Sequence, residues 1–210
     1  MMLPFILIAS GGLGIAVTTA LEVVTSPYSA HVSAFGLNGP VHLLKVVAIA
    51  VFVAGMSGLL LRFRSQLGVV GSLAAGTLSI GTVVGALPYS LAEASLDPSG
   101  TPAQANVELE ALYAAQPWIG EASQIAMPII LLAIIVFGIV ALRRRLFPAW
   151  APVVSLVTIP LAIGAAILGE TTGLPLPHPP AWLFLGLSGY GLAMLSSEAV
   201  VKRVRQPSTT

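Results

Sequence analysis

The sequence predicts an all-α bundle of six transmembrane helices, and three observations lead to this fold class. The chain is 56% hydrophobic and only 8% charged, whereas soluble domains carry about 25% charged residues. Six segments are apolar over about 20 residues, which is the length that spans a bilayer. Basic residues follow every second apolar segment. We therefore expect residues 1–210 to form a single integral membrane domain.

The six predicted spans follow from hydropathy in chain order. The first segment has no Lys or Arg before its apolar run, and this run is longer than the core of a signal peptide, so we expect a retained helix. The predicted spans cover residues 3–24, 41–61, 67–92, 122–142, 149–168 and 181–201. Because the number of spans is even, both termini are expected on the same side of the membrane.

The basic residues predict which side this is. They follow the second, fourth and sixth spans as Arg62 and Arg64, as Arg143, Arg144 and Arg145, and as Lys202, Arg203 and Arg205. Cytoplasmic loops are enriched in Lys and Arg, so both termini are predicted to be cytoplasmic. The composition, rich in Gly, Ala and Pro, is typical of a high-GC bacterial genome. The predicted location is therefore the cytoplasmic (inner) membrane of a bacterium.

The longest outer loop, between the third and fourth spans, is expected to contain a short interfacial helix. Thr101 is a suitable N-cap, Pro102 suits the first helical position, and Gln104 can complete a capping box. Pro117 ends the helix. Its apolar side chains are expected to rest on the membrane or on the other loops: Leu109, Leu112 and Tyr113. The acidic residues assigned to this loop are Glu93, Asp97, Glu108 and Glu110.

Two serines lie in GxSG motifs, GMSG around Ser57 and GLSG around Ser188, which resemble the motif of rhomboid intramembrane proteases. A serine nucleophile needs a histidine within about 3 Å. All three histidines are expected at the outer side, whereas Ser57 lies about one turn from Arg62 and Ser188 lies about 10 Å deep. We interpret both serines as packing residues and predict no catalytic residue.

Glu22 and Lys45 are ionisable residues inside predicted spans, where such residues are rare and usually paired. Each lies about one turn, or about 5 Å, below the outer end of its helix. Because the two helices are consecutive and antiparallel, we expect an ion pair. His42 shares the helical face of Lys45, and Glu121 and Glu170 mark the outer ends of later spans. These five residues form the predicted ligand-binding cluster.

Two interpretations of the cluster remain open. A closed pair within about 4 Å, packed and without a cavity, indicates a structural ion pair. A separated pair that lines an outward-open pocket with His42 or Glu170 indicates a site for a polar headgroup or a solute.

No cofactor and no metal are predicted. The chain has no cysteine and only three histidines, and no short metal-ligand motif is present. Ligation of a metal by histidines and loop carboxylates stays open on spacing alone. The expected partners are membrane lipids and, for an accessory role, another membrane protein; nothing indicates binding of nucleic acid.

The layout of the whole chain resembles the bacterial six-helix family called domain of unknown function 998, which is related in layout to the FRAG and DRAM types of membrane protein. The matching residues in the first outer loop are Ser33, Phe35, Gly36 and Gly39. Asp97 matches the acidic position after the third helix. Trp118 and Glu121 stand where family members often carry a histidine. The resemblance implies a six-helix fold and no particular reaction.

The function predicted from the sequence is that of a non-enzymatic accessory protein or a lipid- or headgroup-binding protein with an outer polar cluster. A small-solute or lipid transporter is an alternative, although the middle of every span lacks a charged residue. A lipid-processing enzyme of the outer leaflet is a second alternative and requires catalytic groups that converge at one depth.

Overall fold

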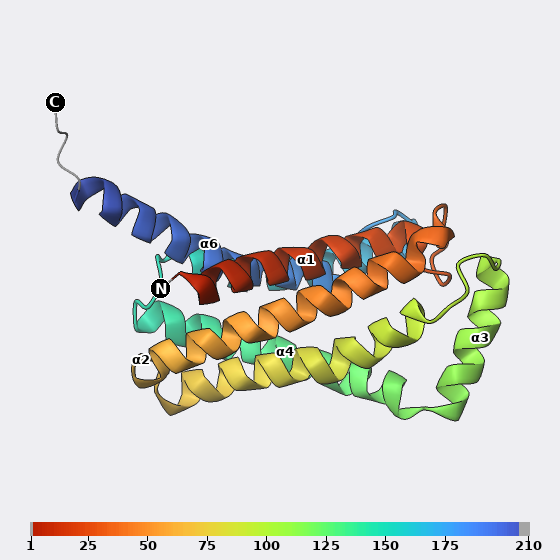
Figure 1. Cartoon of the computed structure of the whole chain (residues 1–210), viewed down its shortest axis with the longest axis horizontal. Coiled ribbons are helices and arrows are strands. Elements are labelled where there is room, and N and C mark those ends of the chain that lie inside the picture. Colours follow the sequence, from red (N-terminus) through yellow and green to blue (C-terminus); the bar gives the residue numbers. More distant parts are fainter. Residues whose placement is uncertain (1, 206–210) are drawn as a thin grey trace.

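The computed structural model describes the backbone of residues 2–205 and the side chains of residues 2–196. Within this part the chain forms α-helices and one short 3-10 helix, and no strand (Figure 1). The elements are α1 (Leu3–Thr25), η1 (Phe35–Leu37), α2 (Asn38–Ala94), α3 (Pro102–Ala115), α4 (Trp118–Arg143), α5 (Trp150–Thr172) and α6 (Pro179–Arg205). The predicted all-α fold class is confirmed. The side chains of Lys202, Arg203 and Arg205 lie outside the described residues.

Helix α2 is a hairpin of two helical arms. Its 57 residues would extend about 85 Å as one straight helix, far beyond the thickness of a bilayer. Gly68 interrupts it with φ 66° and ψ −173°, a conformation that glycine adopts because it has no Cβ. The chain reverses there, so residues 38–67 and 69–94 run side by side (Figure 1). These arms correspond to the second and third predicted spans.

Four helical segments of the described chain are long and apolar enough to cross a membrane. They are Leu3–Thr25, Phe35–Ala94, Trp118–Arg143 and Trp150–Thr172. The second of these contains η1 and both arms of α2. The membrane character that the composition predicts is therefore present in the helices themselves.

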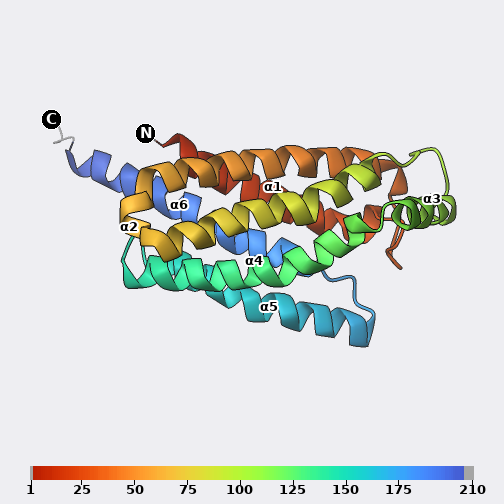
Figure 2. The ribbon, with the colours of Figure 1, turned by 90° about the horizontal axis from the view of Figure 1, so that it is seen from below.

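Small residues allow the helices to approach closely. Helix α1 packs against α2 and α6, α4 packs against α2, and α5 packs against α6 (Figures 1 and 2). A Cβ on Gly55 would lie 2.6 Å from the backbone nitrogen of Ile8, and one on Gly85 would lie 2.6 Å from the Cβ of Ala126. Glycine at these positions brings helix backbones together, as is common in membranes.

The turns that carry arginines meet at one end of the bundle, which we call the basic end (the start of α1 and residues 62–68 and 143–149). Arg144 Nη1 donates a hydrogen bond to the carbonyl of Gln66 at 2.9 Å. The guanidinium of Arg62 lies 5.2 Å from the ring centroid of Phe5. Behind these contacts lies a buried aromatic cluster with neighbouring centroids 5.0 to 6.3 Å apart: Phe5, Phe63, Phe137, Phe147 and Tyr190.

The opposite end, which we call the acidic end (residues 26–37, 93–117 and 170–178), carries α3. The capping box predicted for this helix is confirmed, since Thr101 and Gln104 exchange side-chain to backbone hydrogen bonds of 3.3 and 2.9 Å. Leu109 is fully buried against Phe35 and Leu96. The apolar residues of α3 were predicted to rest on the membrane or on the other loops. In the structure they pack on the other loops.

Candidate functional site

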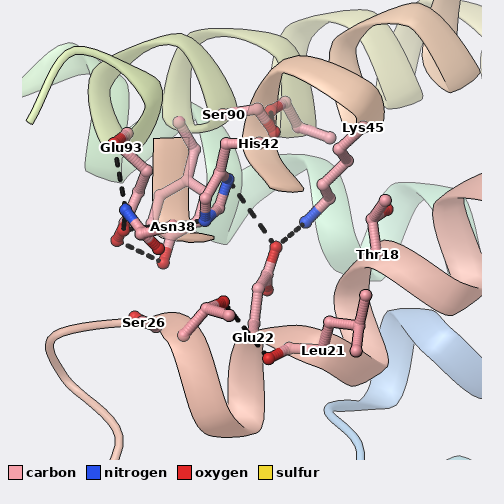
Figure 3. Close-up of polar contacts among 12 residues, drawn as sticks. Thr18, Leu21, Glu22, Ser26, Asn38, His42, Lys45, Ser90 and Glu93 are labelled. Atoms are coloured by element: carbon pink, nitrogen blue, oxygen red, sulfur yellow. Dashed lines mark hydrogen bonds and ion pairs between the residues drawn. The ribbon is translucent and has the colours of Figure 1, made fainter. Parts of the chain in front are cut away.

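An ion pair joins α1 to the first arm of α2 near the acidic end. The ammonium Nζ of Lys45 donates to Oε1 of Glu22 at 2.6 Å (Figure 3). Each of the two residues is only 5% exposed. The pairing predicted from their equal depth is confirmed.

The pair continues into a second buried acidic site through His42. The Nδ1 atom of His42 lies 3.8 Å from Oε1 of Glu22, and its Nε2 atom lies 3.6 Å from Oε2 of Glu93 (Figure 3). Both His42 and Glu93 are fully buried. The imidazole ring therefore stands between two carboxyl groups from two different helical segments, at ion-pair distance from each.

Glu93 is held by neutral donors from both arms of α2. The side-chain amide of Asn38 donates to Oε2 of Glu93 at 3.1 Å and to its backbone carbonyl at 3.0 Å. The hydroxyl of Tyr89 donates to Oε1 at 2.9 Å. The Tyr89 ring also lies 5.9 Å from the Lys45 ammonium and 5.9 Å from the His42 ring. We call these six residues (Glu22, Asn38, His42, Lys45, Tyr89 and Glu93) the polar network.

The placement of Glu93 in the outer loop was wrong. Helix α2 continues to Ala94, and Glu93 is buried rather than solvated. Asn38 and Tyr89 were not predicted as site residues. The four-residue spacing of Tyr89 and Glu93 was the available signal, because it places both side chains on one face of the helix.

Two tyrosines from outside the spans lie near Glu93. Burial, and then the charge of Glu93, raise the pKa of Tyr113 on α3. The same two causes, followed by the charge of Glu110, raise the pKa of Tyr28 in the loop after α1. Both phenols are therefore neutral at physiological pH.

A cavity of about 690 Å³ lies beside the Glu22–Lys45 pair. Its wall is built by α1, both arms of α2, α4, α5, α6 and the segment before α6. Small residues make much of the wall on α2, α4 and α5: Gly85, Ala86, Ala126, Ala165, Ala166 and Gly169. Glu22 and Lys45 contribute charges to this mainly apolar surface.

Exposed residues of the acidic end form the mouth of the cavity. Glu170, His31 and His178 line it and are exposed. The Nε2 of His31 donates to the carbonyl of Gly173 at 2.9 Å, which ties the loop after α1 to the end of α5. The cavity thus reaches solvent at the acidic end.

The five predicted site residues fall into three positions. Glu22 and Lys45 lie on the cavity wall, with His42 directly behind them. Glu170 lies on the wall at the mouth. Glu121 is exposed in the first turn of α4 and is outside the described wall. The structure combines one feature of each interpretation. The ion pair is closed, as expected for a structural pair, and it lines a cavity, as expected for a ligand site.

Among the described residues, no group of three or more His, Cys, Asp or Glu side chains is arranged to hold a metal ion. Comparisons of the chain with protein-family models, with curated proteins and with solved structures found no match. The resemblance to domain of unknown function 998 therefore stays a prediction.

Proposed function

We propose that this chain is a multi-pass protein of a bacterial cytoplasmic membrane that binds the polar headgroup of an amphipathic molecule in an outward-facing cavity. The two arms of α2 count as separate spans, so that α1, α2, α4, α5 and α6 provide six crossings. The contact between Arg144 and the carbonyl of Gln66 supports this topology, because it joins two arginine-bearing turns at one end of the bundle. The positive-inside rule then makes the basic end cytoplasmic.

The observation that carries the binding function is the position of the Glu22–Lys45 pair on the wall of a large apolar cavity. Ligand sites in proteins are typically concavities of about 300–1,000 Å³, mostly apolar, with a few polar groups that orient the ligand. The cavity of about 690 Å³ falls in this range. An ion pair with a purely structural role needs no such space beside it.

The arrangement of α4 and α5 favours an amphipathic ligand. Toward the basic end these helices are in contact, since a Cβ on Gly138 would lie 3.0 Å from Cδ2 of Leu156. Toward the acidic end they diverge (Figure 2), and both contribute to the cavity wall. An acyl chain can therefore extend from the cavity toward the lipid between α4 and α5 while its headgroup stays near Lys45.

Binding is favoured over transport because the two ends of the bundle differ. The aromatic cluster fills the bundle interior at the basic end. A transporter needs a continuous polar path, with charges or broken helices near the middle of the membrane. The charged side chains of the polar network instead lie near the acidic end.

The experiment is to purify the full chain in native lipid discs and to identify the lipids retained by each protein molecule with mass spectrometry. Ala166 lines the cavity, so Ala166→Trp should fill it and abolish retention. Ile163, on the same helix, is 51% exposed and lies outside the wall, so Ile163→Trp is the matched control. We expect one class of lipid to remain with the unaltered chain and with Ile163→Trp. Equal retention by the two variants, or no retention by the unaltered chain, contradicts the proposal.

A further inference from the structure

The charges of the polar network determine how many protons it holds. Besides the phenol of Tyr89, which donates to Glu93, its ionisable groups are two carboxyls, one ammonium and one imidazole, contributed by Glu22, Glu93, Lys45 and His42. With both carboxyls ionised and the imidazole neutral, the group carries one net negative charge. A net negative charge on a buried cluster is strongly disfavoured, because ions lose their hydration on burial and need compensating partners.

The orientation of the His42 ring gives an independent argument for one further proton. Each ring nitrogen faces a carboxyl oxygen, at 3.8 Å on the side of Glu22 and 3.6 Å on the side of Glu93. A neutral imidazole has one N–H and one lone pair, so one of its nitrogens would direct a lone pair at a carboxylate. This repulsion disappears when the imidazole is protonated or when the facing carboxyl carries a proton. The triad of Glu22, His42 and Glu93 therefore shares one proton, which makes the polar network neutral.

Other ionisable side chains face the triad or line the cavity from several elements. They are Lys45 and Tyr89 of α2, Tyr28 of the loop after α1, Tyr113 of α3, Glu170 of α5, and His31 and His178 at the mouth. The tyrosines stay neutral, and Glu170 and the two mouth histidines are exposed to solvent. The triad and Lys45 are thus the buried groups that respond to a charged ligand.

We propose that the cavity binds an anionic headgroup, and that binding is coupled to the uptake of one proton by the triad of Glu22, His42 and Glu93. This inference rests on the proposed function, since it names the ligand class of the same cavity. Lys45 is the one lysine or arginine among the described residues of the wall. An anion that contacts its ammonium competes with the carboxylate of Glu22 and adds a negative charge to a neutral buried group. A proton from water at the mouth, bound by a carboxyl oxygen of the triad, restores neutrality.

The coupling has a defined dependence on pH. When a ligand binds together with one proton, its affinity falls about tenfold for each unit that the pH rises. The ligand therefore binds more tightly at acidic pH. A ligand without net charge leaves the proton count unchanged and has no such dependence.

The experiment is calorimetric titration of the full chain in nonionic micelles, in buffers with different enthalpies of ionisation, which counts the protons taken up. The probes are dioctanoyl phosphatidylglycerol, dioctanoyl phosphatidylcholine, and dimethyl phosphate, an anion without acyl chains. We expect phosphatidylglycerol to bind about tenfold or more tightly than phosphatidylcholine, with uptake of one proton. The double variant Glu22→Gln with Glu93→Gln leaves the network with one net positive charge from Lys45, so phosphatidylglycerol should neutralise this charge without proton uptake. Glu108→Gln, an exposed change on α3, is the control and should still take up one proton.

The outcomes separate the two proposals. Binding of both lipids with equal affinity and without proton uptake overturns the anionic coupling and leaves the proposed function standing. Binding of neither lipid overturns the proposed function. Dimethyl phosphate that binds as tightly as phosphatidylglycerol, with one proton, keeps the coupling but contradicts an amphipathic ligand. If this double variant does not fold, the proton counts of the unaltered chain with the two lipids decide.

Discussion

The two ends of the bundle use the same helices in opposite ways. At the basic end, aromatic rings and close glycine contacts fill the interior, and the arginines lie outside this packing at the turns. At the acidic end, α4 and α5 diverge, a cavity opens, and charged side chains are buried along it. The buried charges are therefore next to space that a ligand can occupy, whereas the tightly packed end contains none of the polar network.

The largest expected effect comes from removing one charge at the acidic end. Lys45→Met leaves the buried carboxylate of Glu22 without its cation, and breaking a buried pair costs about 3–5 kcal/mol. We expect this loss in the free energy of unfolding, measured in mixed micelles by titration with denaturing detergent. The double change Glu22→Gln with Lys45→Met should recover most of it. A double variant as unstable as the single one would show that the ion pair is not the cause.

A smaller effect is expected from crowding the packed end. In Gly55→Ala the new methyl would lie 2.6 Å from the Ile8 nitrogen and 2.9 Å from the Pro4 carbonyl oxygen. These backbone atoms cannot move aside independently, so the variant should lose about 1–3 kcal/mol. Gly76→Ala on the other arm of α2 is the control, since nothing lies within 4 Å of its new methyl. Equal thermal stability of the two variants would contradict close packing at this end.

The smallest effect concerns the helix that covers the acidic end. Thr101→Ala removes the N-cap of α3, which should cost about 1 kcal/mol, while Thr101→Ser keeps a capping hydroxyl. Amide hydrogen exchange within residues 102–115 should become faster in the alanine variant only. Because α3 packs on the loops and not on the cavity wall, lipid retention should stay unchanged. Exchange that is equally fast in both variants would show that the cap contributes nothing.

Much of the fold could be predicted from the sequence, because its signals are local. Hydropathy marks the long apolar helices, and the residues that start and stop α3 lie within or next to that helix. The Glu22–Lys45 contact was also predictable, since two residues at equal depth on consecutive antiparallel helices are neighbours. Each of these inferences needs only the helix rise and the order of the elements.

The remainder of the site depends on contacts between distant segments. Glu93 is buried because Asn38 and Tyr89 bind its side chain and because α3 and the loop after α1 pack nearby. The distribution of charge along the sequence had placed Glu93 in the acidic outer loop. The cavity depends on the angle between α4 and α5, which hydropathy does not contain.

The aromatic cluster at the basic end also bears on the energetics of the proposed site. A cavity that opens at one end exchanges ligand and protons with the water on that side alone. In the conformation described here, its occupancy therefore follows the acidity and composition of one compartment. The voltage and the proton gradient across the membrane supply no work to it. Under the proposed function, occupancy of the cavity would report the state of that compartment at equilibrium, and many copies in a membrane would not dissipate the proton-motive force.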